Sequence, residues 1–164
     1  MKSRLIRFTL FTILATLLSL LVACGGGAVA AADLPVYPAA VQLQTGEDPI
    51  ADTLANNMAQ DAAMRNSLGV GGKMEQMVFR LPENTSWDQV NNFFDAELKA
   101  AGWDSGLGGM AGSIAADAMA SANAGNEMFQ MGMWSKGQQN LTLTRMVDVS
   151  NTTQPYLILS LNTN

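Results

Sequence analysis

The clearest pattern along the chain is a set of four strand-like segments, in most of which apolar residues recur at every second position. These are residues 74–81, 127–135, 140–149 and 156–161. A period of two is typical of β-strands that bury one face, and Lys136-Gly137 between two of the segments is typical of a hairpin turn. We predict four strands, the last three of them in a meander whose second turn covers residues 151–155. Val41 and Leu43 predict a further short strand.

Two other segments carry apolar residues at the three- and four-residue spacing of an α-helix. In residues 86–102, Ser86 and Gln89 form a capping-box pattern and the apolar stripe is continuous. The stripe consists of Trp87, Val90, Phe94, Leu98 and Ala101. Residues 49–68, with Asp48 as the predicted N-cap, carry a weaker stripe. We therefore predict a core helix at residues 86–102 and a surface helix at residues 49–68.

These elements follow one another as short strand, helix, strand, helix and three-stranded meander. That order predicts an α+β fold with a four- to five-stranded antiparallel sheet, one core helix on a face and a second, surface helix. Residues 34–164 are enough for a single domain of this kind. Residues 104–125, rich in Gly, Ala, Ser and Met, predict an insertion between the core helix and the next strand, and within it residues 113–122 have the composition of a short helix.

The first 24 residues are organised differently. Three cationic residues within positions 1–7 precede an uncharged, largely apolar run over residues 8–22. A basic start and a short apolar core are the layout of an export signal, and the run is shorter than the roughly 20 residues that span a bilayer as a helix. The run ends in Leu21-Val22-Ala23-Cys24, which resembles the lipobox of bacterial lipoproteins at all four positions.

The resemblance implies that residues 1–23 are a signal peptide in which Leu21, Val22 and Ala23 are recognised by the lipoprotein signal peptidase. It also implies that Cys24 carries a covalent diacylglycerol on its sulfur and an N-acyl chain such as palmitate. Two or three acyl chains give stable anchoring where one does not. We therefore expect a lipid anchor in the cell membrane or outer membrane, with the domain facing outside the cytoplasm.

Residues 24–33, which contain the lipidated cysteine and then mostly Gly and Ala, predict a flexible tether between lipid and domain. Two alternatives to the lipobox interpretation are left open. One is an ordinary signal peptide cut at the small residues that end in Ala30 or Ala32, and the other is an uncleaved anchor.

Charge and composition narrow the possible functions. The net charge is −5, and without the three leader cations it is −8, so we expect no nucleic-acid partner. Histidine is absent and Cys24 is the single cysteine, so the chain lacks the usual metal ligands and the usual general base. We predict no metal site, no cofactor beyond the covalent lipid, and no enzymatic activity.

Three further features concern binding. Residues 106–111 match the G-x-G-x-x-A dinucleotide pattern, but no strand is predicted before them, so we expect no such site. A group of five methionines predicts an apolar contact surface in preference to a copper site. These are Met110, Met119, Met128, Met131 and Met133. Trp87, Trp103 and Trp134 fit either a sugar-stacking set or core packing, and core packing is favoured.

Together these observations favour a lipid-anchored, non-catalytic domain that binds an envelope protein or serves as a structural module of the cell envelope. The alternative is a carrier or sensor of an apolar small ligand held between helix and sheet. An exposed patch within residues 107–134 would favour the first hypothesis. A closed cavity of roughly several hundred Å³ would favour the second.

Overall fold

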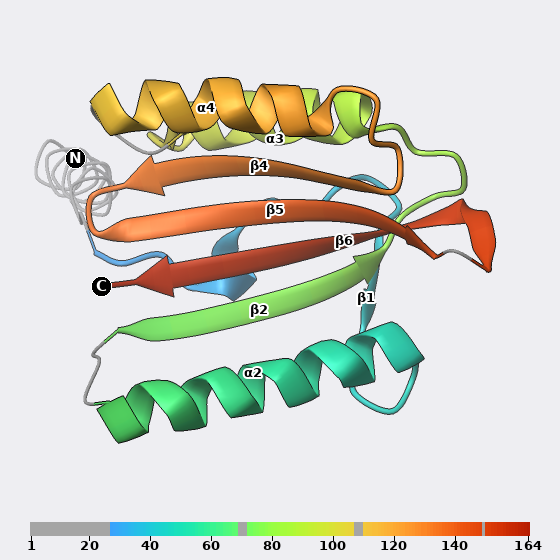
Figure 1. The fold of residues 1–164 in the computed structure, drawn as a ribbon, viewed down its shortest axis with the longest axis horizontal. Coiled ribbons are helices and arrows are strands. Elements are labelled where there is room, and N and C mark those ends of the chain that lie inside the picture. The colour runs from blue at the N-terminus through green and yellow to red at the C-terminus, as the bar shows by residue number, and fades with distance from the viewer. Residues whose placement is uncertain (1–26, 69–71, 107–109, 149) are drawn as a thin grey trace, which may run out of the picture.

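The computed structural model describes residues 27–68, 72–106, 110–148 and 150–164. These residues form a six-stranded antiparallel sheet with the strand order β1-β2-β6-β5-β4-β3, together with three α-helices (Figure 1). The strands are β1 (Val41–Leu43), β2 (Lys73–Arg80), β3 (Asp104–Ser105), β4 (Phe129–Lys136), β5 (Gln139–Asp148) and β6 (Asn151–Thr163). The helices are α2 (Pro49–Leu68), α3 (Trp87–Ala100) and α4 (Met110–Asn123).

The predicted α+β class, the antiparallel sheet and the core helix are confirmed, but the sheet has more strands and the fold more helices than predicted. The additional strand β3 and the additional helix α4 both lie within residues 104–125, the segment predicted as an insertion, and α4 extends beyond the short helix whose composition was noted at residues 113–122. β3 pairs with β4 through Asp104 opposite Ser135. A strand of two residues is too short to show a period of two, so the alternation along the chain could not indicate it.

The connection between β5 and β6 also differs from the prediction. β6 begins at Asn151, so the turn predicted for residues 151–155 is wrong. The register shifts here, because Val147 lies opposite Pro155 whereas Asp148 lies opposite Asn151. A proline has no N–H to donate to the strand pairing, and a bulge is one of the few places where a strand accommodates it. The segment is therefore an irregular strand with the composition of a turn.

One face of the sheet carries the main core. Val90, Phe94 and Leu98 of α3 have no exposed surface, and they pack on alternate residues of β2, β4, β5 and β6. These are Phe79, Trp134, Leu141, Leu143, Leu157, Leu159 and Leu161, joined by Leu81 and Trp103. The full burial of the α3 stripe confirms residues 86–102 as the core helix of the fold.

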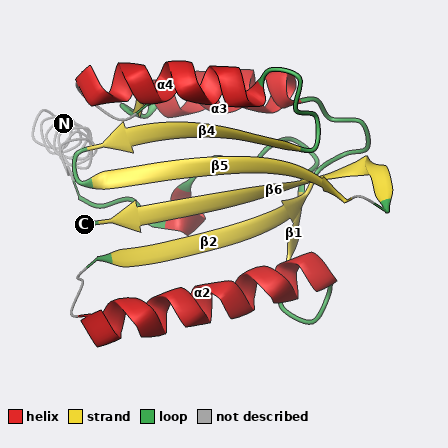
Figure 2. Ribbon diagram, viewed as in Figure 1, coloured by secondary structure: helices red, strands yellow, loops and turns green. Residues whose placement is uncertain are grey.

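The opposite face is covered along β1 and β2 by α2 (Figure 2). A smaller cluster lies beneath that helix and contains Leu43, Ala51, Val78 and Tyr156. Asp48 caps α2 as predicted, since its Oδ1 accepts the N–H of Ile50 at 2.9 Å. Its Oδ2 accepts hydrogen bonds from Arg80 at 2.8 Å and from the Tyr156 hydroxyl at 3.3 Å. The cap therefore also ties the helix to β2 and β6.

Much of the segment predicted as a flexible tether is packed against the sheet. The Gln139 side chain accepts the N–H of Val29 at 2.7 Å and donates to the Val29 carbonyl at 2.8 Å. Ala31, in a 3₁₀ turn over Ala31–Asp33, is 4% exposed and joins the main core. Residues 24–26 lie outside the described residues. Among residues 27–33, the packed part thus begins at Val29.

Candidate functional site

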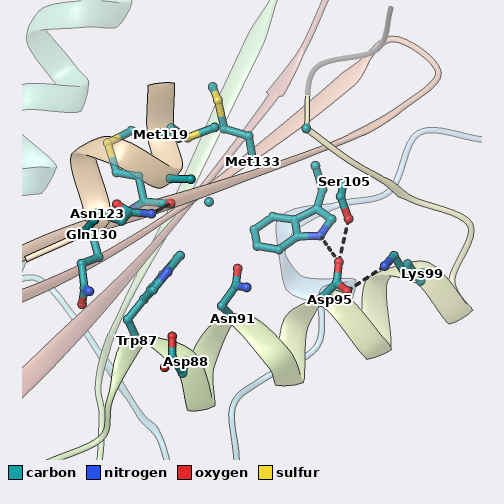
Figure 3. Close-up of a pocket in the computed structure, with 16 residues that line it drawn as sticks. Trp87, Asp88, Asn91, Asp95, Lys99, Ser105, Met119, Asn123, Gln130 and Met133 are labelled. Atoms are coloured by element: carbon teal, nitrogen blue, oxygen red, sulfur yellow. Dashed lines mark hydrogen bonds and ion pairs between the residues drawn. The ribbon is translucent and has the colours of Figure 1, made fainter. Parts of the chain in front are cut away.

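A groove of about 570 Å³ lies between α3 and α4 and is floored by β4 (Figure 3). We call it the α3–α4 groove. Its α3 wall consists of Trp87, Asp88, Asn91, Asp95 and Lys99, and its α4 wall of Met119, Ala120, Asn123 and Ala124. The floor consists of Gln130, Met131, Gly132, Met133 and Trp134 of β4, and the lining is completed by Ser105 of β3 and the following Gly106. A volume of this size is within the range of small-ligand sites, about 300–1,000 Å³.

The α3 wall follows from the helical spacing of four of its residues. Trp87, Asn91, Asp95 and Lys99 recur every four positions, so they share one stripe of the helix. That stripe adjoins the buried stripe of the core. The capping box fixes where the helix begins, because Ser86 Oγ accepts the N–H of Gln89 while Gln89 Oε1 accepts the N–H of Ser86. Trp87 is therefore held in the first turn.

Asp95 of α3 is bonded to β3 and to β4 at one end of the groove. Its Oδ2 accepts a hydrogen bond from Lys99 at 2.8 Å, and its Oδ1 accepts one from Ser105 at 2.6 Å. Trp134 Nε1 donates to the same Oδ1 at 3.4 Å. The bonds from Lys99, Ser105 and Trp134 hold the pKa of Asp95 below its ordinary value of 3.8, although burial acts in the other direction. Asp95 is thus an ionised carboxylate whose two oxygens both accept hydrogen bonds.

The floor of the groove depends on a glycine. A Cβ atom at Gly132 would lie 2.7 Å from Cη2 of Trp134 and 3.2 Å from Cη2 of Trp87. Only a residue without a side chain therefore lets both indole rings lie over β4. Trp134 is 2% exposed, whereas Trp87 is half-buried and lines the open groove.

A buried arginine orients the amide of Gln130. Arg145 Nη1 donates to Gln130 Oε1 at 3.1 Å and to the Glu127 carbonyl at 3.0 Å, and Arg145 Nε donates to the Thr85 carbonyl at 2.9 Å. Burial lowers the pKa of Arg145, an effect that the Glu127 carboxylate partly offsets. Since the Gln130 oxygen faces the guanidinium, its NH₂ group is the end left for other partners. The Asn91 amide makes no hydrogen bond to any residue that the structure describes.

The α4 wall is fastened to the outer edge of β4 by side-chain amides. Asn123 Oδ1 accepts the N–H of Met131 at 2.9 Å, and Asn123 Nδ2 donates to the Met131 carbonyl at 2.7 Å. Asn126 Oδ1 accepts the N–H of Phe129 at 3.1 Å. The two asparagines thus take the place of a neighbouring strand, and the groove has a closed edge along this stretch of β4.

The predicted contact methionines are only partly brought together. Met119, Met131 and Met133 line the groove, whereas Met128 is 40% exposed and lies outside its lining. Met110 is the first residue of α4, and its side chain lies outside what the structure describes. Whether these methionines form an apolar contact surface stays a prediction.

The remaining predicted residues have different outcomes. Leu21, Val22, Ala23 and Cys24 lie outside the described residues, so the lipidation site stays a prediction. Trp103 is 3% exposed and packs in the core as expected.

The glycine-rich motif at residues 106–111 follows a short strand after all, because β3 ends at Ser105 and α4 begins at Met110. However, β3 is an antiparallel edge strand, whereas the dinucleotide fingerprint requires a βαβ unit with parallel strands.

The spacing of the α3 wall was available in the sequence but was not recognised there. The prediction for residues 86–102 rests on the apolar stripe alone, whereas the structure places the polar residue Asp95 half-buried beside that stripe. The polar stripe at Asn91, Asp95 and Lys99, one position after each core residue, and the lone Gly132 in an alternating strand were the two available signals.

Comparison of the chain with protein-family models, with curated proteins and with solved structures found no match. In the described part of the chain, no helix is both long and apolar enough to cross a membrane. Within the same residues, no three acidic or cysteine side chains come together as a possible metal site.

Proposed function

We propose that this chain is a lipid-anchored extracytoplasmic lipoprotein whose folded domain is a non-catalytic binding module, with the α3–α4 groove as its binding site. The observation that carries the proposal is the groove itself. It has the volume of a ligand site, and its lining includes the side-chain amides of Asn91 and Gln130, the second of which is held in place by Arg145.

The anchor rests on the lipobox resemblance at Leu21-Val22-Ala23-Cys24. The docking of Val29 on Gln139 supports a short link between lipid and domain. Five residue steps separate Cys24 from Val29, which is at most about 18 Å of extended chain. A lipidated Cys24 would thus hold the domain close to the bilayer surface.

A binding role fits the groove better than catalysis does. Asp95, its most enclosed acid, has both oxygens engaged by Lys99, Ser105 and Trp134. Those bonds lower its pKa, whereas a general acid needs a raised one. The groove therefore offers hydrogen bonds and apolar contact without a carboxyl group prepared for proton transfer.

The core argues against an apolar ligand held between α3 and the sheet. Val90, Phe94 and Leu98 belong to one core cluster with Leu141, Leu143 and Leu159, and all six side chains are completely buried.

One observation favours a second candidate function, the docking of an envelope protein. Met128 and Phe129, which precede and begin β4, are 40% and 46% exposed. Paired exposed apolar side chains of this kind are frequent in protein contacts.

Intact-mass analysis of protein extracted from bacterial membranes tests the anchor. The expected mass is that of residues 24–164 with a diacylglyceryl group and one further acyl chain. The matched control is Cys24→Ser, which keeps the size of the side chain but removes the thiol. Without the thiol, the protein in the membrane fraction should carry no acyl chain. A wild-type protein that begins at Ala31 or Asp33, or that keeps Met1 with an unmodified thiol, would contradict the proposal.

A further inference from the structure

We propose that the α3–α4 groove binds a neutral saccharide, with one sugar ring against the Trp87 indole and its hydroxyls bonded to Asn91 and Gln130. This inference rests on the proposed function, because it takes the groove as the binding site. Figure 3 shows Trp87 and Asn91 rising from the same helix toward the groove, and Trp134 lines it as well.

The groove offers the two kinds of surface that a sugar presents. A sugar ring has apolar C–H faces and a rim of hydroxyl groups. The half-buried Trp87 indole provides an aromatic face with a negative quadrupole, which attracts C–H groups that carry a slight positive charge. Each amide group both donates and accepts, so Asn91 is able to bond two neighbouring hydroxyls at once.

Arg145 makes the Gln130 contact directional. Because Oε1 of Gln130 accepts from the Arg145 guanidinium, its NH₂ group is presented as a donor. Arg145 is itself fixed by the carbonyls of Thr85 and Glu127. The donor is therefore oriented before any ligand arrives, which reduces the entropic cost of binding.

Charge argues for a neutral ligand. Lys99 neutralises Asp95, which leaves the exposed carboxylate of Asp88 as the net charge of the lining. The domain after residue 23 carries −8, so an anionic glycan would be repelled.

A purely apolar ligand would leave the amides of Asn91 and Gln130 without partners in a desolvated site, which is unfavourable. A peptide that adds as a strand is disfavoured as well. The N–H and C=O of Met131 on the edge of β4 are already taken by Asn123.

Titration of the lipidated protein, residues 24–164, in a detergent without a sugar headgroup tests the inference. The neutral probes are maltotriose and chitotriose, the anionic probe is trigalacturonate, and the peptide probe is trialanine. Calorimetry and tryptophan fluorescence are followed together. We expect saturable binding of at least one neutral trisaccharide, with a change in indole emission, and no binding of trigalacturonate.

Asn91→Ala should weaken saccharide binding about 3- to 10-fold, the effect of one or two lost neutral hydrogen bonds. Asn92→Ala is the matched control, because Asn92 is the next residue on α3, is exposed and does not line the groove. It should bind like the wild type. Trp87→Phe, which keeps an aromatic ring, should bind more weakly than the wild type, and urea unfolding of each variant verifies that it is folded.

Each outcome has one meaning. Binding of a neutral trisaccharide that is weakened by Asn91→Ala but not by Asn92→Ala supports the saccharide inference. Binding of trialanine alone, with the same sensitivity, overturns the saccharide inference and leaves the groove as a binding site. If no probe binds in an Asn91-sensitive way up to about 10 mM, both the saccharide inference and the proposal of the groove as a binding site are overturned. The lipid anchor is tested separately, by the mass of residues 24–164.

Discussion

Replacing Gly132 by alanine tests how closely the floor of the groove is packed. The new Cβ would lie 2.7 Å and 2.9 Å from two ring carbons of Trp134, and 3.2 Å from Cη2 of Trp87. Trp134 has little room to move, because it is 2% exposed and its Nε1 donates to Asp95. The extra methyl group must therefore displace one of the indole rings or the β4 backbone.

The expected effect follows from two opposing contributions. Inserting a methyl group into a filled site costs about 1–3 kcal/mol of unfolding free energy. The backbone of Gly132 is not in the left-handed region, so alanine is allowed there and gains up to about 1 kcal/mol by restricting the unfolded chain. We expect Gly132→Ala to lower the free energy of unfolding by about 1–2 kcal/mol, or Tm by about 4–8 °C.

Urea unfolding followed by far-UV circular dichroism measures this difference without relying on the displaced indoles. Gly27→Ala is the control, because a Cβ there meets nothing within 4 Å, and it should change the unfolding free energy by less than about 0.5 kcal/mol. In a Trp134→Phe background the cost of Gly132→Ala should shrink, since the smaller ring leaves space. A Gly132→Ala protein as stable as the wild type would refute the packing of both rings over this glycine.

Three further predictions concern the ends of the helices. Asp48→Ala removes the α2 cap and the partner of Arg80, and should cost about 2–3 kcal/mol in urea unfolding at pH 7. Burial acts to raise the pKa of Asp48, but its hydrogen bonds, led by the one from the Ile50 N–H, outweigh burial and lower the pKa. The stability difference between the two proteins should therefore disappear as the pH falls below 3.8 and through the native pKa. A difference that persists at such pH values would contradict this. Ser86→Ala should cost about 1 kcal/mol by the same measurement, and no loss would mean that the capping box does not stabilise α3. Asn123→Ala should speed amide exchange at Met131 about 10-fold or more, and unchanged exchange would show that α4 is held by other contacts.

Short-range signals in the sequence were sufficient for the main framework. The capping box at Ser86 and the buried stripe of α3 lie within one stretch of 17 residues, so the core helix could be predicted from spacing alone. The same holds for β5, in which every second residue is buried. Asp48 as the cap of α2 is a further local feature that the structure confirms.

The errors come from pairings between distant parts of the chain. Whether residues 151–155 form a turn or a strand depends on the Leu81 N–H, which donates to the Pro155 carbonyl at 3.0 Å, and on the Asn84 N–H, which donates to Thr153. The two-residue strand β3 likewise exists only because β4 lies beside it. No local propensity encodes such partners.

The groove could not be predicted because it depends on where the insertion returns to the sheet. The stripe at Asn91 and Asp95 would face water if α4 were absent. The amide of Asn123, 32 residues along the chain from Asn91, holds α4 beside this stripe by bonding to the backbone of Met131. Only the assembled fold makes a wall of this polar stripe.

Because α4 provides one wall of the groove, ligand binding and the docking of α4 must be linked. The helix is held to β4 through the amides of Asn123 and Asn126, and Met131 exchanges its amide proton when that contact opens. A ligand that touches both walls binds the docked state and not the open one, so at a concentration of 100 times its Kd it should slow exchange at Met131 about 100-fold. Exchange at Leu54, in α2 on the other face of the sheet, should change far less, because local opening of that helix leaves the groove intact. Hydrogen exchange measured by mass spectrometry with and without maltotriose resolves the two residues, and equal slowing of both would mean that the ligand stabilises the whole domain and not the α4 wall.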